Sequence, residues 1–208
     1  MPARAKALGR PPAFDRDRAL DRAMRVFWRK GFEGTSLNDL TSAMGIRPPS
    51  LYAAFGNKQA LFEEALGRYL ARQVGFMNEA LDETTAYRVA EQMLRRGAEF
   101  LTRPGPRCGC MTIESALVGG AEGAPIRQKL TQVRLRSQDA LRRRFERAKS
   151  EGDLPESSNS ADLARFIFAI VQGMTVQSIN GATREELLRL GKMALRAWPQ
   201  PDSPQRAQ

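Results

Sequence analysis

The sequence of 208 residues contains no histidine. This absence removes Ser-His-Asp and Cys-His nucleophile pairs and every histidine-ligated metal site. The motifs GxGxxG, Walker A and GxSxG, which mark dinucleotide, nucleotide and acyl-transfer sites, are also missing. We therefore expect that the protein is not an enzyme, and that it holds no resident metal or cofactor.

Cysteines and long apolar segments are equally scarce. The two cysteines, Cys108 and Cys110, are too few for a disulfide framework. No run of 18 apolar residues is present, and the basic N-terminus is not followed by the apolar stretch of a secretory signal. These features predict a folded cytoplasmic protein without a membrane association.

Positive charge is abundant and unevenly placed. Residues 1–58 contain 11 Lys/Arg and 5 Asp/Glu, a net charge of +6 (11 − 5), whereas the other 150 residues contain 22 and 18, a net charge of +4 (22 − 18). A basic N-terminal part favours binding of a polyanion such as nucleic acid. A solvated basic face without a partner would give the same numbers.

Apolar residues recur at helical spacing along the chain, and no stretch alternates as a strand would. The sequence thus predicts an all-α protein with about nine helices. The expected helices span residues 15–30, 35–44, 49–55, 57–81, 87–102, 111–118, 125–150, 162–179 and 183–198. The first of them has a full apolar stripe, in which we assign Phe27 and Trp28 to the core.

Residues 35–58 form the most informative stretch. A Thr-Ser pair supplies an N-cap for a short helix, and Gly45 follows where a chain leaving a helix often adopts a left-handed conformation. Two prolines then stand where a second helix begins. Leu51 and Phe55 can hold that helix against the first one, which leaves its small or amphipathic face outward. This order predicts a helix-turn-helix whose second helix enters the major groove of DNA.

Two further features flank this stretch. Arg10 lies in a Gly-Arg-Pro sequence within a basic arm, which is suited to a narrow minor groove. A disordered leader without a role is the alternative. Lys58 begins the next helix, where a phosphate would meet both an ammonium group and free backbone N–H groups.

The chain from about residue 14 to residue 70 resembles the DNA-binding head of the TetR family of transcriptional regulators (TetR/AcrR type). The motif order of that head is present, ending in the L-Y-x-x-F-x-x-K pattern. Its members here are Gly31-Phe32, Thr35-Ser36, Gly45, Leu51-Tyr52, Phe55 and Lys58. The second domain shows no comparable motif.

The resemblance implies a homodimeric, ligand-responsive regulator, most simply a repressor that leaves a pseudo-palindromic operator on double-stranded DNA when a small molecule enters the second domain. It implies a helix-turn-helix domain at 13–58 and a ligand-binding and dimerisation domain at 59–198. The composition of the two ends predicts a flexible basic arm at 1–12 and a disordered tail at 199–208. By position, the phosphate contacts are Thr35, Ser36, Tyr52 and Lys58, and Arg47, Pro49, Ser50 and Ala53 lie towards base edges.

The last two helices are expected to pack as a four-helix bundle between subunits. The residues assigned to that interface are Leu163, Phe166, Ile167, Ile170, Leu187, Leu190, Leu195 and Trp198. An effector cavity is expected among the helices of the second domain, with Met93, Phe100, Met111, Ile170 and Met174 as its candidate lining. Apolar residues at helical spacing are also what an ordinary core contains.

Three interpretations of Cys108 and Cys110 remain open. The two residues can be a partly buried structural pair near the domain junction. They can form a redox switch, because a nearby helix N-terminus and Arg107 favour the thiolate. They can also bind a soft metal such as Cu(I) together with Met111.

Two other functions fit the same sequence. An architectural protein would bind DNA without sequence preference, and a helical ligand-binding protein or enzyme would carry the basic face incidentally. Ala53 and Ala54 weaken the assignment of base contacts, because alanine can touch a thymine methyl group but cannot donate a hydrogen bond.

Overall fold

The computed structural model describes residues 14–73, 75–104, 109–113 and 123–199. Every regular element in these ranges is a helix, which confirms the predicted all-α fold. No helix in the described ranges is long and apolar enough to cross a bilayer. The predicted basic arm and all but the first residue of the predicted tail lie outside these ranges.

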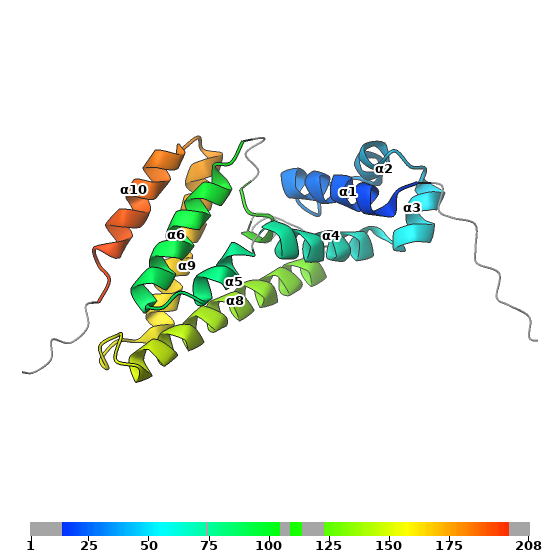
Figure 1. The fold of residues 1–208 in the computed structure, drawn as a ribbon. Coiled ribbons are helices and arrows are strands. Elements are labelled where there is room, and N and C mark those ends of the chain that lie inside the picture. The colour runs from blue at the N-terminus through cyan, green and yellow to red at the C-terminus, as the bar shows by residue number, and fades with distance from the viewer. Residues whose placement is uncertain (1–13, 74, 105–108, 114–122, 200–208) are drawn as a thin grey trace, which may run out of the picture.

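Nine helices have bounds within the described residues, and their labels follow Figure 1. They are α1 (Arg16–Lys30), α2 (Leu37–Met44), α3 (Pro48–Phe55), α4 (Lys58–Gln73), α5 (Phe76–Leu81), α6 (Ala86–Leu101), α8 (Ala124–Ser150), α9 (Ser160–Ile179) and α10 (Arg184–Leu195). Several start where the sequence predicts a cap. The Asp15 side chain accepts from the Arg18 N–H, and Thr183 and Glu186 form a capping box.

The predicted single helix at 57–81 is wrong. The chain forms α4 and then α5, and Gly75 is the N-cap residue of α5. Glycine is a poor helix former, which favours a break at this point over a continuous helix. Of the predicted helix at 111–118, residues 111–113 are helical and the remainder lies outside the described residues.

Helices α1 to α4 enclose a first core at one end of the molecule (Figure 1). Phe27, Leu40, Leu51 and Phe62, one from each helix, are fully buried there. Gly45 joins α2 to α3 with φ 69° and ψ 34°, the left-handed conformation expected from the sequence. This core continues along α4 beyond residue 58, and the domain boundary at that residue stays a prediction.

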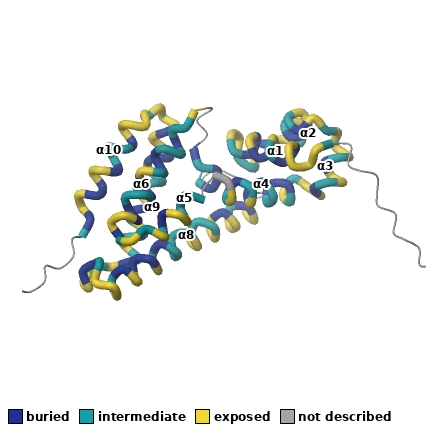
Figure 2. Tube along the Cα trace, viewed as in Figure 1, coloured by how far each residue is buried: buried dark blue, intermediate teal, exposed yellow. Residues whose placement is uncertain are grey.

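A second core lies among α6, α8, α9 and α10, and buried segments fill the inside of both groups of helices in Figure 2. The long helix α8 joins the two cores. Ile126 and Leu130 at its start belong to the first, and Leu141 and Phe145 farther along belong to the second. A displacement of α8 is therefore felt by both parts of the molecule.

Candidate DNA-binding surface and regulatory cavity

Helix α3 presents an outward face that no other helix covers. Leu51 and Phe55 are buried and anchor the helix in the first core, as the sequence predicts. On the opposite side, Tyr52 is 46% exposed and Arg47, Pro49 and Ala53 are exposed as well. Ser50 is half-buried. The residues predicted to lie towards base edges are thus exposed or half-buried on α3 and at its N-cap, and Figure 1 shows this helix at one end of the molecule.

The two residues predicted to contact phosphates before the start of α2 differ in their exposure to solvent. Ser36 is exposed and forms a capping box with Asp39. Thr35 is buried, and its hydroxyl donates to the Gly31 carbonyl oxygen at 2.6 Å. The Thr35 hydroxyl therefore closes the turn between α1 and α2, and the predicted phosphate contact of Thr35 stays a prediction. Sequence spacing gave no sign of this orientation.

A charged network stabilises this turn. The Lys30 ammonium donates to Asp39 at 2.6 Å, and the same carboxylate accepts from the backbone N–H of Ser36 at 2.9 Å. The Lys30 hydrogen bond, followed by those from Ser36, holds the pKa of the Asp39 carboxyl far below its usual range. The capping box therefore keeps its negative charge at every physiological pH.

Lys58 is the first residue of α4, where the sequence places it. The preceding Asn57 side chain accepts from the Ala60 N–H at 2.8 Å, which caps the helix. The Lys58 ammonium lies over the Phe32 ring, 4.6 Å from its centroid. This cation–π contact holds the Lys58 ammonium against Phe32, at the start of α4.

Arg22 is a candidate that sequence reasoning missed. Its guanidinium lies beside Gly45, because an atom built at the Cβ position of that glycine would be 3.4 Å from Nη1. Among the described residues it forms no ion pair, unlike Arg16, which is paired with Glu64 at 2.8 Å. The sequence indicates only that Arg22 is on the polar side of α1. Its place at the helix-turn-helix turn follows from packing.

Cys110 lies in a short segment, 109–113, that contacts three helices. The Tyr69 hydroxyl of α4 lies 3.4 Å from its Sγ atom, and the Thr112 hydroxyl lies 3.1 Å from it. The Trp28 indole of α1 donates to the Gly109 carbonyl oxygen at 3.0 Å. Burial, followed by the interaction with Cys110, raises the pKa of Tyr69 well above its usual value, so this phenol stays a neutral donor. Cys108 lies outside the described residues.

A small cavity of about 60 Å³ adjoins this segment. Its walls come from α4, α5, α8, α9 and the segment itself. They include Leu70, Met77, Cys110, Thr112, Arg134 and Phe168. Phe100 and Ile170 are half-buried, Met93, Met111 and Met174 are buried, and none of the five lines this cavity, so their assignment to an effector cavity stays a prediction. They are core residues, which periodicity alone does not distinguish from a binding site.

The predicted dimer residues also divide into two groups. Ile167, Leu187, Leu195 and Trp198 are buried in the second core of their own chain, because α10 packs closely on α6, where a Cβ atom on Gly191 would lie 3.3 Å from the Leu94 Cβ atom. Their assignment to an interface between subunits stays a prediction. Leu163, Phe166, Ile170 and Leu190 are half-buried.

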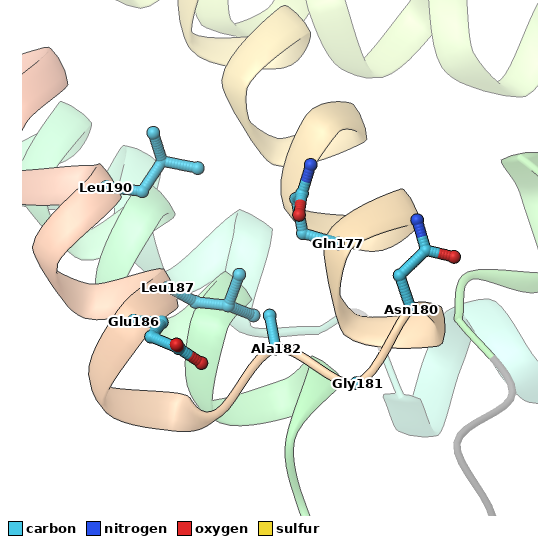
Figure 3. A pocket seen from close by; sticks show the side chains of 7 residues that line it. All are labelled: Gln177, Asn180, Gly181, Ala182, Glu186, Leu187 and Leu190. Atoms are coloured by element: carbon cyan, nitrogen blue, oxygen red, sulfur yellow. The ribbon is translucent and has the colours of Figure 1, made fainter.

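The outer side of α9 and α10 carries its own apolar groups. Val176, Ile179 and Met193 are 47%, 45% and 62% exposed. Between the two helices is an open groove, which Gly181 and Ala182 close at one end. Figure 3 shows Gln177 and Asn180 on one side of it and Leu187 and Leu190 on the other.

Comparison with known families agrees with this arrangement. The model of bacterial regulatory proteins of the tetR family matches residues 19–65, and a Tetracyclin repressor-like C-terminal domain matches residues 88–187. The HTH-type transcriptional repressor ComR of Escherichia coli is 32% identical over 197 residues, which cover 94% of each chain. The chain belongs to the TetR family. It is thus a helix-turn-helix transcriptional regulator, and the recognition made from its motifs is confirmed.

Solved structures of TetR-family proteins give the same result. A cysteine-substituted variant of the regulator CifR, complexed with 26-bp double-strand operator DNA, is 43% identical with a TM-score of 0.87. The match covers 92% of this chain and 100% of that one. A putative TetR regulator from Rhodococcus sp. RHA1 is 41% identical with a TM-score of 0.62, and covers 88% and 98%.

Proposed function

We propose that this chain is a homodimeric repressor, which binds a pseudo-palindromic operator through α3 and leaves it when a small-molecule or redox signal reaches the second domain. The observation that carries the proposal is the outward face of α3, anchored by Leu51 and Phe55 and open at Arg47, Tyr52 and Ala53. On this account the protein has no catalytic role and acts in the cytoplasm, where its DNA target lies.

In the proposed complex, α3 lies in the major groove. Arg47 and Ser50 supply hydrogen bonds to base edges, and Pro49 and Ala53 supply apolar contacts. The phosphate contacts come from Ser36, Tyr52 and Lys58, joined by Arg22 beside the turn. Arg10, outside the described residues, is proposed to reach the adjacent minor groove.

The proposed dimer uses the outer side of α9 and α10. Exposed Val176, Ile179 and Met193, together with half-buried Phe166 and Leu190, give this side an apolar character that a second copy would bury. A two-fold axis through this side pairs the two heads for half-sites on one duplex. The heads lie at the end of each chain away from α10 (Figure 1).

The signal is proposed to act on the segment 109–113, because this segment lines the cavity and also forms hydrogen bonds with Trp28 of α1 and Tyr69 of α4. For a redox signal, oxidation or alkylation of Cys110 would alter its contacts with Tyr69 and Thr112. Alkylation that leaves operator affinity unchanged, with no other ligand present, would exclude the thiol as the sensor.

Selection of bound fragments from a random DNA pool, followed by footprinting, tests the proposal. We expect a protected inverted repeat of roughly 15–30 bp, since dimeric heads read half-sites about one helical turn or a multiple of it apart. Uniform affinity for all sequences with a steep salt dependence would support an architectural protein instead. No affinity for DNA at low salt would support a ligand-binding protein with an incidental basic face.

A further inference from the structure

The cavity beside Cys110 has one cationic group in a mainly apolar wall, which also includes the polar residues Thr112, Ser137 and Gln172. Arg134, on α8, lines it together with Leu70, Met77, Phe168 and Val171. Leu70, Met77 and Val171 are half-buried and Phe168 is buried, and they come from three different helices. A ligand in this space is therefore surrounded mainly by hydrocarbon and meets a guanidinium at one side.

No carboxylate compensates this guanidinium among the described residues. Arg134 donates from Nη1 to the Thr112 carbonyl oxygen at 2.6 Å and from Nη2 to the Thr131 hydroxyl at 2.9 Å. Burial lowers the pKa of Arg134 below its usual value, the direction expected for a cation without an anionic partner. By contrast, Arg68 on α4 forms ion pairs with both Asp17 and Asp21. Its pKa is raised, and the hydrogen bond to Asp17 is the largest cause.

The size of the cavity limits the ligand. A volume of about 60 Å³ limits the ligand to a small molecule of a few heavy atoms. A chain of about three to five carbons with a carboxylate at one end belongs to this class of molecule. A carboxylate also matches the planar donor geometry of an arginine, which a neutral hydroxyl group does not.

We propose that the effector of this regulator is a short-chain aliphatic carboxylate, whose carboxylate group pairs with Arg134 and whose hydrocarbon chain fills the cavity between α4, α8 and α9. The proposal rests on the proposed function in one respect, since it identifies the cavity as the place where the signal is received. Binding itself does not depend on DNA.

The contacts of the same arginine give the carboxylate a route to the first core. The Nη1 group of Arg134 holds the Thr112 carbonyl oxygen, so a carboxylate that engages this guanidinium would compete with that contact. Thr112 belongs to the segment whose Gly109 carbonyl oxygen accepts from Trp28 of α1 and whose Cys110 contacts Tyr69 of α4. Withdrawal of Arg134 from Thr112 therefore loosens the attachment of α1 and α4, on which the position of α3 depends.

Isothermal titration of the full chain at pH 7.5 and constant ionic strength tests the binding. The probes are the straight-chain carboxylates from acetate to octanoate and the primary alcohols of equal length. We expect the tightest binding for a chain of about three to five carbons, and affinities about 10- to 100-fold lower for the matched alcohols. Alcohols that bind as tightly as carboxylates, or carboxylates that do not bind at all, would overturn the proposal.

Variants of α8 provide the control for charge. Arg134→Gln should weaken binding of the preferred carboxylate about 10- to 100-fold, whereas Arg136→Gln, an exposed arginine two residues farther along, should leave it unchanged. Equal weakening by both variants would contradict a site at Arg134. If Arg134→Gln fails to fold, as judged by circular dichroism, the comparison of carboxylates with alcohols on the unaltered chain still decides the matter.

Operator affinity separates this proposal from the function on which it rests. With selected operator fragments, the preferred carboxylate should lower the affinity of the unaltered chain and spare that of Arg134→Gln. A chain that binds carboxylates as described but recognises no operator would refute the proposed repressor and leave the carboxylate site intact. Operator binding without carboxylate binding would do the reverse.

Discussion

The two parts of this molecule use apolar residues in opposite ways. In the first core, the apolar side of α3 is turned inward, and the helix displays Arg47, Tyr52 and Ala53. In the second part, α9 and α10 bury one apolar side against α6 and α8 and still expose Val176, Ile179 and Met193. A helix with apolar residues on one side only, such as α3, packs that side on its own core and leaves a polar surface outward. A helix with apolar residues on two sides, such as α9, has a second apolar surface that a further protein partner can bury.

The largest effect is expected from a charged substitution on the exposed apolar side of α9. Val176→Asp would place a carboxylate from each subunit in the proposed dimer interface, and a buried unpaired charge costs several kcal/mol. We expect a monomer by sedimentation at micromolar concentration and loss of operator binding. Leu135→Asp, at another exposed apolar position on α8, should leave the dimer intact. A dimer that persists in the first variant would show that this side of α9 is not the interface.

The next effect concerns the turn that orients α2 and α3. A Cβ atom on Gly34 would lie 2.4 Å from the Lys30 carbonyl oxygen, so Gly34→Ala must displace the backbone. We expect a loss of about 2–3 kcal/mol of stability, measured by urea unfolding, together with weaker operator binding. Gly67→Ala on α4 has open space at that position and should be neutral or slightly stabilising. Equal stability of the two variants would contradict this reading of the turn.

A slightly smaller loss of stability is expected from a substitution in the second core. The Arg144 guanidinium is buried and donates to the carbonyl oxygens of Leu81, Glu83 and Thr84, which ties α8 to the end of α5. Arg144→Ala leaves these acceptors without a donor and should cost about 2 kcal/mol in urea unfolding. The neighbouring Arg143, exposed and paired only with Asp139 across one turn, should tolerate the same substitution. Operator contacts themselves should not change in either variant.

The smallest effect is a pH dependence confined to the first core. The folded-state pKa of Asp39 is depressed, so its contribution to stability is present above the unfolded pKa of about 4 and is lost as pH falls below it. The slope of unfolding free energy with pH between about 4 and 2 should therefore decrease in Asp39→Asn. Asp162→Asn, at an exposed pair on α9, serves as the control. An unchanged slope in Asp39→Asn would mean that Lys30 and Ser36 do not hold this charge.

The parts of the fold that the sequence predicts correctly are those with local signals. Asp15, Gly45 and Thr183 mark helix ends through their own backbone chemistry, and the structure has the ends there. The sites that depend on packing could not be predicted in this way. The Thr35 hydroxyl points into the protein, and Arg22 of α1 lies beside Gly45 at the end of α2. Cys110 and Arg134, which are distant in the sequence, line the same cavity.

The most direct test of the central claim is a comparison of operator affinity among three alanine variants. If α3 reads DNA, Arg47→Ala should cost about 1–3 kcal/mol per head and relax the preference for the selected operator, and Tyr52→Ala should weaken binding to all sequences alike. Arg88→Ala, an exposed arginine on α6, should change neither. Unaltered affinity and preference in both Arg47→Ala and Tyr52→Ala would contradict the placement of α3 against the duplex.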